Sequence, residues 1–315
     1  MNRKAIIFGI KSSFLNNDEK QLFLKYKPWG IILFSRNIKN LQQLKYLVSS
    51  IKKLFNDKNY PVLIDQEGGK VSRLNKILDF STFSQTYFSN LYLKNKNIFM
   101  NHYNVYINTI SNILNDSGIN INITPVMDLK HKNTHSVIGS RSFSNKTYII
   151  KKLGSLTIDL YNNNKIGTVI KHIPGHGLST VDSHKNLPYV NETRKYLIKN
   201  DFDSFKSSKS FFAMTSHVIY KSIDPMNTAT HSSYLLNNIV RKNIGFKGIL
   251  ITDDISMKAL KFTLKENAIK ALEAGCNLVL HCNGKMSEMA KLAKYIPRVD
   301  DFTQKKTSQF YKFLG

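Results

Sequence analysis

The segment 171–188, KHIPGHGLSTVDSHKNLP, concentrates ionisable side chains in one stretch that is interrupted by glycine and proline. Its candidate chemical groups are Lys171, His172, His176, Asp182 and His184. Ordinary loops use Ser, Asn, Gly and Asp for their turns, whereas a lysine with three histidines offers proton donors, proton acceptors and cationic contacts. The segment directly follows the apolar run 168–170, and a strand that leads into a loop is a common way to present catalytic groups on a rigid scaffold. We therefore expect an active site here.

Other apolar runs also end in ionisable residues, which are Asp65, Asp128, His217, Asp253 and His281. A charged side chain inside a packed core costs several kcal/mol unless it is paired. At the carboxyl ends of parallel strands the same groups are accessible, and they converge on one side of the sheet. Six runs that end this way, counting the one before the 171–188 segment, indicate a shared site at the strand ends.

The apolar runs themselves predict the scaffold. There are eight, at residues 5–10, 30–34, 61–65, 121–124, 168–172, 211–216, 248–253 and 277–281. Most are continuous rather than alternating, which is typical of strands buried on both faces of a parallel sheet. Helical patterns fall between them, at residues 41–55, 98–114, 147–161, 234–244 and 264–274, with Asn40 and Gly275 placed as caps.

This alternation predicts an α/β fold, a (β/α)8 TIM-type barrel in which residues 1–315 form a single domain. A doubly wound open sheet is the alternative fold, but no GxGxxG motif follows an early strand. No stretch rich in Pro, Ser and Gly marks a linker to a second domain.

Composition restricts the class of protein further. The 315 residues are 42% hydrophobic, but no apolar run approaches the roughly 20 residues of a membrane span, and the run 5–10 is too short for a secretory segment. We therefore expect a cytoplasmic protein. Cys276 and Cys282 have neither a redox nor a zinc spacing, which indicates two thiols in a reducing compartment.

The net charge is +25, with an isoelectric point near 9.8. Such a charge suggests nucleic-acid binding, but the lysines are spread along the chain and form no basic block or helix face. We attribute the charge to compositional drift and expect no nucleic-acid partner. A positive field that attracts an anionic substrate stays open.

Six segments carry a family resemblance, in order and in spacing: LIDQEGGKVSRL, ITPVMDL, VIGSRSF, KHIPGHG with DSH, MTSHVIY and ITDDISM. Together they resemble glycoside hydrolase family 3 over roughly residues 5–285, and most of all its single-domain β-N-acetylglucosaminidases of bacterial cell-wall recycling. The resemblance implies a barrel, no metal, no cofactor and a retaining mechanism through a covalent glycosyl-enzyme.

The resemblance also implies the reacting groups. The first acid of the TDD motif, Asp253, would be the nucleophile, and we expect Asp254 to cap the next helix. Adjacent acids can instead position the substrate's own acetamido oxygen as nucleophile, so that mechanism stays open. His184 would be the general acid and base, with Asp182 orienting its ring.

Substrate binding follows from the same resemblance. Asp65 would accept hydrogen bonds from sugar hydroxyls, and Arg73, Arg141, Lys171 and His172 would donate them. His217 would line the same pocket or be a satisfied residue near the core. Alternatively, the two arginines pair with Asp65 or Glu67 as structural ion pairs.

The histidines of the 171–188 segment do not predict a metal site. His172, His176 and His184 are separated by three and seven residues, a proline and a glycine interrupt any helix, and HExxH is absent. We interpret His176, between two glycines, as loop structure.

Two departures from the family pattern stand out. Lys70 occupies a position where the family commonly has arginine. Lysine keeps the positive charge but cannot form the two parallel hydrogen bonds that a guanidinium forms. The stretch 79–97 is unlike the proline-rich loop usual there, and we expect a remodelled loop.

The expected substrate is a small carbohydrate, a muropeptide fragment from which terminal non-reducing GlcNAc is released. A β-glucosidase or β-xylosidase of the same family is an alternative, as is an inert basic protein that binds nucleic acid or wall polymer. Water and phosphate stay open as acceptors, and nothing in the sequence favours one oligomeric state.

Overall fold

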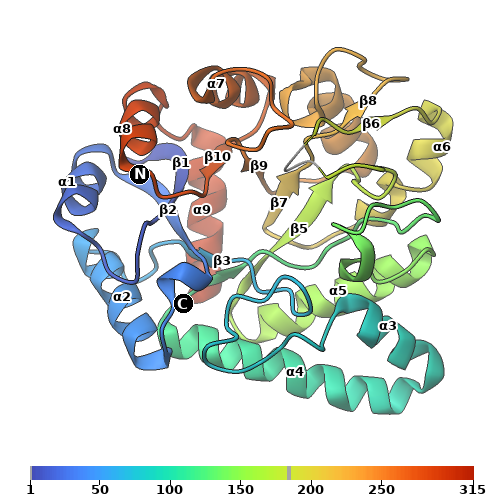
Figure 1. The fold of residues 1–315 in the computed structure, drawn as a ribbon, viewed down its shortest axis with the longest axis horizontal. Coiled ribbons are helices and arrows are strands. Elements are labelled where there is room, and N and C mark those ends of the chain that lie inside the picture. The colour runs from blue at the N-terminus through green and yellow to red at the C-terminus, as the bar shows by residue number, and fades with distance from the viewer. Residues whose placement is uncertain (1, 183–185) are drawn as a thin grey trace.

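The eight apolar runs form a closed barrel of eight parallel strands (Figure 1). In the computed structural model, which describes residues 2–182 and 186–315, these strands are β1 (Lys4–Gly9), β2 (Pro28–Leu33), β3 (Val62–Ile64), β4 (Ile121–Asn122), β5 (Gly167–Ile173), β7 (Phe212–Thr215), β9 (Ile249–Asp254) and β10 (Leu278–His281). Their order around the barrel follows the chain, and β1 closes on β10 with Ile7 opposite Leu280. The predicted (β/α)8 TIM-type fold is confirmed.

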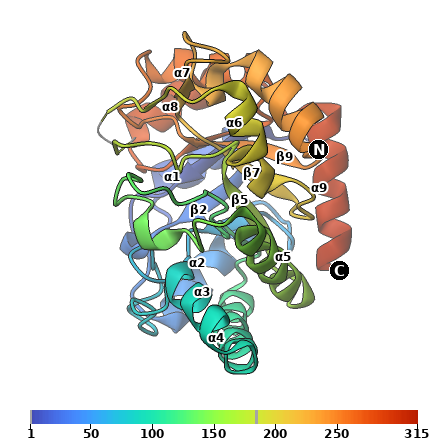
Figure 2. The same ribbon diagram turned by 90° about the vertical axis from the view of Figure 1, so that its right-hand side faces the viewer.

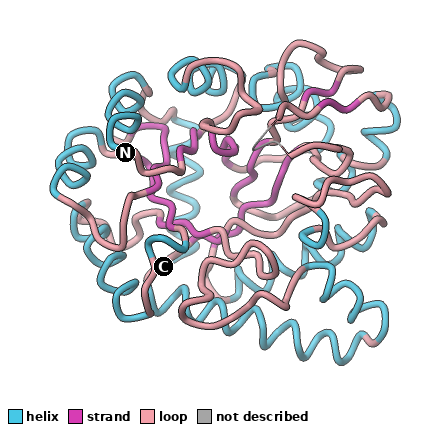
Figure 3. Tube along the Cα trace, viewed as in Figure 1, coloured by secondary structure: helices cyan, strands magenta, loops and turns pink. Residues whose placement is uncertain are grey.

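Helices surround the strands as an outer layer, which Figure 3 shows in cyan around the magenta barrel. They are α1 (Asn17–Tyr26), α2 (Leu41–Leu54), α3 (Gln85–Lys94), α4 (Lys96–Ser117), α5 (Thr147–Asn163), α6 (Arg194–Lys199), α7 (Leu264–Ala274), α8 (Met286–Tyr295) and α9 (Asp301–Leu314), with a π-helix at Leu235–Ile244. None of the helices in the described ranges combines the length and the apolar character that crossing a membrane requires.

The ends of several helices follow from local sequence. The Asn40 side chain accepts a hydrogen bond from the backbone N–H of Gln43 and so begins α2, as expected. Gly275 ends α7 in the left-handed conformation, at a φ of 119°, which only glycine adopts at little cost. Both predicted caps are confirmed.

The stretch 79–97 differs from the loop expected there, because most of it forms α3. Ser84 caps this helix. The aromatic side chains of α3 explain why a sequence with little hydrophobic periodicity is helical. The Phe88 ring lies 4.7 Å from that of Tyr103 and 4.6 Å from that of Tyr106, both on α4. Burial against a neighbouring helix therefore outweighs weak local propensity.

The amino-terminal end of the barrel is closed by α9, which Figure 2 shows on the side away from the long loops that follow β5. The Phe310 ring packs 5.1 Å from that of Phe212, and the Trp29 indole donates a 2.9 Å hydrogen bond to Thr307. The loops lie at the opposite end, where the strands finish. Within these loops, β6 (Tyr189–Val190) and β8 (Ile219–Tyr220) form a short parallel pair.

Candidate active site

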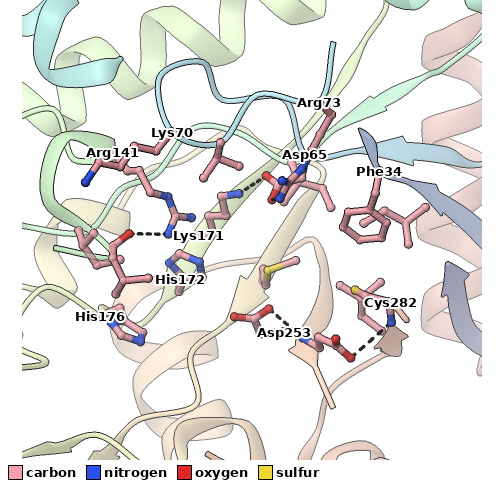
Figure 4. Close-up of a pocket in the computed structure, with 18 of the residues that line it drawn as sticks. Phe34, Asp65, Lys70, Arg73, Arg141, Lys171, His172, His176, Asp253 and Cys282 are labelled. Carbon is pink, nitrogen blue, oxygen red and sulfur yellow. Dashed lines mark hydrogen bonds and ion pairs between the residues drawn. The ribbon is translucent and has the colours of Figure 1, made fainter. Parts of the chain in front are cut away.

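Six of the predicted site residues line one cavity of about 350 Å³ at the carboxyl ends of the strands (Figure 4). They are Asp65, Arg73, Arg141, Lys171, His172 and Asp253. Asp65 directly follows β3, Lys171 and His172 belong to β5, and Asp253 lies at the end of β9. A concave site of this size with convergent charged groups suits a small polar ligand. The strand ends thus gather side chains that are almost 190 residues apart in sequence.

The upper wall of the cavity is a network of ion pairs centred on Lys171. The Lys171 ammonium lies 2.5 Å from Asp65 Oδ1 and 2.5 Å from Glu67 Oε1. Arg141 donates two hydrogen bonds to Glu67, of 2.8 Å from Nε and 2.7 Å from Nη2. Arg73 Nη2 lies 3.2 Å from Asp65 Oδ2. The arginines therefore pair with the two acids that the sequence offered as alternatives, and every member of these pairs except Glu67 lines the cavity.

Glu67 is the most enclosed acid of this network, with a side chain only 2% exposed. Burial alone would raise the pKa of Glu67, but the Arg141 guanidinium and the Lys171 ammonium outweigh it and lower the pKa from 4.5 to about 2. Glu67 is therefore ionised across the ordinary pH range and holds both cations in place.

A glutamate with a depressed folded-state pKa makes the fold sensitive to acid. Its stabilisation is complete above pH 4.5 and is lost as the pH falls from 4.5 towards 2, because protonation then favours the unfolded chain. Glu67→Gln is expected to flatten the fall in the free energy of unfolding over this window, as measured by urea unfolding at several pH values. Glu273→Gln, at an exposed site on α7, is the control and should keep the wild-type slope. A wild-type slope in Glu67→Gln would contradict this assignment.

A second charged group, Asp128, lies behind the cavity wall. It is fully buried, and its Oδ2 lies 2.7 Å from Nδ1 of His172. Its Oδ1 accepts the backbone N–H groups of His172, at 3.2 Å, and His176, at 2.7 Å. Asp128 thus fixes both the His172 ring and the turn that follows β5.

The side chain of His176 also lines the cavity, whereas the sequence indicated loop structure only. Its ring centroid lies 5.6 Å from that of His172. Burial, followed by the nearby His172, lowers the pKa of His176 to about 4, so its ring is neutral near pH 7. His176 therefore contributes a polar but uncharged surface to the site.

Asp253 and its neighbour Asp254 both line the cavity, but their carboxylates have different hydrogen-bond partners. Asp253 points into the cavity (Figure 4), with Oδ1 accepting the 2.8 Å hydrogen bond of the Asp254 N–H. The Asp254 carboxylate instead accepts bonds from Ser256, of 3.0 Å from N and 2.8 Å from Oγ. The expectation that Asp254 caps the next helix is wrong, because a turn intervenes and Thr263 caps α7. Asp254 stabilises that turn.

Three other predicted residues are not among those that line the cavity in the described part of the chain. His217 is 1% exposed and does not line the cavity, since its Nδ1 lies 2.8 Å from Thr230 Oγ1 and its Nε2 lies 3.2 Å from the Asp254 carbonyl. Asp182 is half-buried on the segment after β5, and His184 falls outside the described residues. Within the ranges 2–182 and 186–315, no three His, Cys, Asp or Glu side chains are grouped as a metal ion requires.

Sequence reasoning missed two residues that organise the site, Glu67 and Asp128. Glu67 was considered only as a partner for an arginine, and Asp128 only as a residue at a strand end. Their position in the segments that follow β3 and β4 was a signal, since acids near buried strand ends need cationic or N–H partners. The identity of these partners depends on which strands lie next to each other in the barrel.

The sequence matches the N-terminal domain of glycosyl hydrolase family 3 over residues 10–307. The beta-hexosaminidase of Haemophilus influenzae is 30% identical over 285 residues, covering 89% of this chain and 79% of the relative. That of Neisseria gonorrhoeae is 32% identical over 290 residues, covering 89% of this chain and 78% of the relative.

Solved structures agree with these relatives. Neisseria gonorrhoeae NagZ in complex with N-trifluoroacetyl-D-glucosamine superposes with a TM-score of 0.85 at 28% identity, covering all of this chain and 90% of that one. A family 3 β-N-acetylglucosaminidase from Paenibacillus gives 0.83 at 25% identity, covering 98% of this chain and 60% of that one. The chain therefore belongs to glycoside hydrolase family 3.

Proposed function

We propose that the protein is a retaining exo-β-N-acetylglucosaminidase that releases terminal GlcNAc from β-1,4-linked peptidoglycan fragments, such as GlcNAc–anhydroMurNAc peptides. The observation that carries the proposal is the position of Asp253, which points into a cavity walled by Lys171, His172 and Asp65. The names of the relatives support β-hexosaminidase activity, and the gonococcal neighbour was solved with an N-acylated glucosamine analogue. A cytoplasmic location is part of the proposal, and cell fractionation tests it.

In the first step, the Asp253 carboxylate attacks the anomeric carbon, and the bond to the glycosidic oxygen breaks. His184, oriented by Asp182, gives its proton to the departing oxygen. In the second step, His184 takes a proton from water, whose oxygen bonds to the anomeric carbon as the bond to Asp253 breaks. The enzyme returns to its starting state, and the sugar keeps its β configuration after two inversions.

The ion-pair network has a distinct role in this proposal. Asp65 offers oxygen acceptors to sugar hydroxyls, while Arg73, Arg141 and Lys171 offer N–H donors. Because each group is already held by an opposite charge, little reorganisation is needed when the sugar binds. Charged partners also make these hydrogen bonds stronger than bonds between neutral groups.

A substitution at His184 tests the proposed acid. His184→Ala is expected to lower kcat/KM by about 100- to 10,000-fold for a GlcNAc disaccharide, whose leaving oxygen needs a proton. The same variant should lose less than about tenfold on 2,4-dinitrophenyl β-GlcNAc, whose leaving group departs as an anion. The measurement is steady-state kinetics with both substrates.

Two comparisons complete this test. Wild-type enzyme should hydrolyse aryl β-GlcNAc much faster than aryl β-glucoside, and equal rates would reject the proposed substrate. Equal losses in His184→Ala on both leaving groups would reject His184 as the acid while leaving the substrate assignment intact.

A further inference from the structure

The contact between Asp128 and His172 determines which ring nitrogen of His172 faces the cavity. Burial alone would raise the pKa of Asp128, but His172 and the N–H group of His176 outweigh it and lower the pKa. Asp128 is thus an ionised carboxylate, which only accepts hydrogen bonds. At 2.7 Å from its Oδ2, the Nδ1 atom of His172 must therefore carry a proton.

The other ring nitrogen, Nε2, is then an acceptor as long as the ring is neutral. Nε2 makes no hydrogen bond to any other group in the described ranges, while the His172 side chain lines the cavity (Figure 4). A carboxylate that sets the tautomer of a histidine in this way is a familiar device of hydrolases.

We propose that Asp128 is a positioning residue that turns His172 into a hydrogen-bond acceptor and so selects sugars with a free hydroxyl group at the position facing Nε2. This inference rests on the proposed function, since it assumes that a GlcNAc unit occupies the cavity. The neighbouring Lys171 ammonium only donates, so the two side chains offer opposite partners to a hydroxyl, which both donates and accepts.

A sugar in which this hydroxyl group is replaced by an alkyl ether is rejected for two reasons, its larger size and its loss of a hydrogen-bond donor. An ether oxygen has no hydrogen to donate, and its lone pairs face the lone pair of Nε2. A buried acceptor left without its donor discriminates strongly between two ligands, because the desolvation of that acceptor is then not compensated. The substrate class is therefore an N-acetylhexosamine that is unsubstituted at this ring position.

Asp128→Asn tests the inference with aryl β-GlcNAc substrates methylated singly at oxygen 3, 4 or 6. The asparagine keeps an oxygen for the backbone N–H groups, but its own N–H group faces Nδ1 and moves the ring proton to Nε2. The Nε2–H group of His172 can then donate a hydrogen bond to an ether oxygen of the substrate. For one of the three positions, the ratio of kcat/KM for the hydroxyl substrate to that for the methyl ether should fall by at least about tenfold relative to wild type.

Asp201→Asn is the matched control. Asp201 is 2% exposed and lies 2.9 Å from Nε2 of another histidine, His131, but neither residue lines the cavity. This variant should keep the wild-type ratios at all three positions. The inference is overturned when Asp128→Asn keeps them too, or when both variants change them equally.

The wild-type protein in its resting state offers a second measurement, which does not depend on catalysis. Two-dimensional ¹⁵N NMR of the imidazole rings, with the His172 signals assigned from His172→Gln, should find one ring proton on Nδ1 and none on Nε2. A proton on Nε2 would overturn the inference. Failure of the proposed function is distinguishable, because wild-type enzyme would then hydrolyse no β-GlcNAc substrate at all.

Discussion

Asp253→Ala is expected to lower kcat/KM for aryl β-GlcNAc by at least about 1,000-fold, because the account gives this carboxylate the bond-forming step. Asp253 is held at the end of β9, and it points into the cavity across from Lys171 and His172. In the proposed function its role is chemical rather than structural, so the variant should unfold at nearly the wild-type temperature. Steady-state kinetics and thermal unfolding of the purified variant test both statements.

Asp254→Asn is the matched control and separates two mechanisms. The Asp254 carboxylate is engaged by Ser256, so a direct nucleophile at Asp253 predicts a loss of about tenfold or less. A mechanism that uses the substrate's acetamido oxygen needs both acids to act on the substrate. Comparable losses in Asp253→Ala and Asp254→Asn would therefore favour the acetamido mechanism and contradict this assignment.

Lys171→Met is expected to have the second largest effect, on both stability and activity. The change leaves Asp65 and Glu67 close together without the ammonium between them, and breaking a buried pair in this way costs about 3 to 5 kcal/mol. It also removes a charged donor to the sugar, so kcat/KM should fall by about tenfold or more. Urea unfolding and kinetics on aryl β-GlcNAc measure the two effects.

Lys151→Met provides the comparison at the surface. Lys151 lies 3.1 Å from Asp203, and both side chains are about one-third exposed. Water screens such a pair, so its loss should cost less than about 1 kcal/mol and leave kinetics unchanged. Equal destabilisation by the two lysine variants would show that the ion pairs of the cavity wall do not stabilise the fold as described.

Much of the scaffold could be predicted because a parallel barrel leaves a strong local pattern. A strand buried on both faces is a continuous apolar run, and each of the eight runs became a barrel strand. The ionisable residues at the ends of β3, β5 and β9 then had to share one side of the barrel. This geometry brings Asp65, Lys171 and Asp253 together in the cavity, as the strand ends indicated.

What the sequence did not reveal depends on contacts between distant segments. The helix α3 is stabilised by aromatic packing on α4, and no hydrophobic periodicity in its own sequence indicates this contact. Pairing of Arg141 with Glu67, and of His172 with Asp128, joins residues 74 and 44 positions apart. In both cases, the missing information is which segments neighbour in space. The misassignment of Asp254 has another cause, because the predicted ranges 248–253 and 264–274 already left ten residues between the strand and the helix that Asp254 was expected to cap.

The most direct test of the central claim is covalent trapping with a fluorinated N-acetylglucosaminyl inactivator, followed by peptide mapping by mass spectrometry. The account predicts that one sugar is attached to each protein chain, through the carboxylate of Asp253. Attachment to another residue, or turnover that continues with no attached sugar, would contradict it.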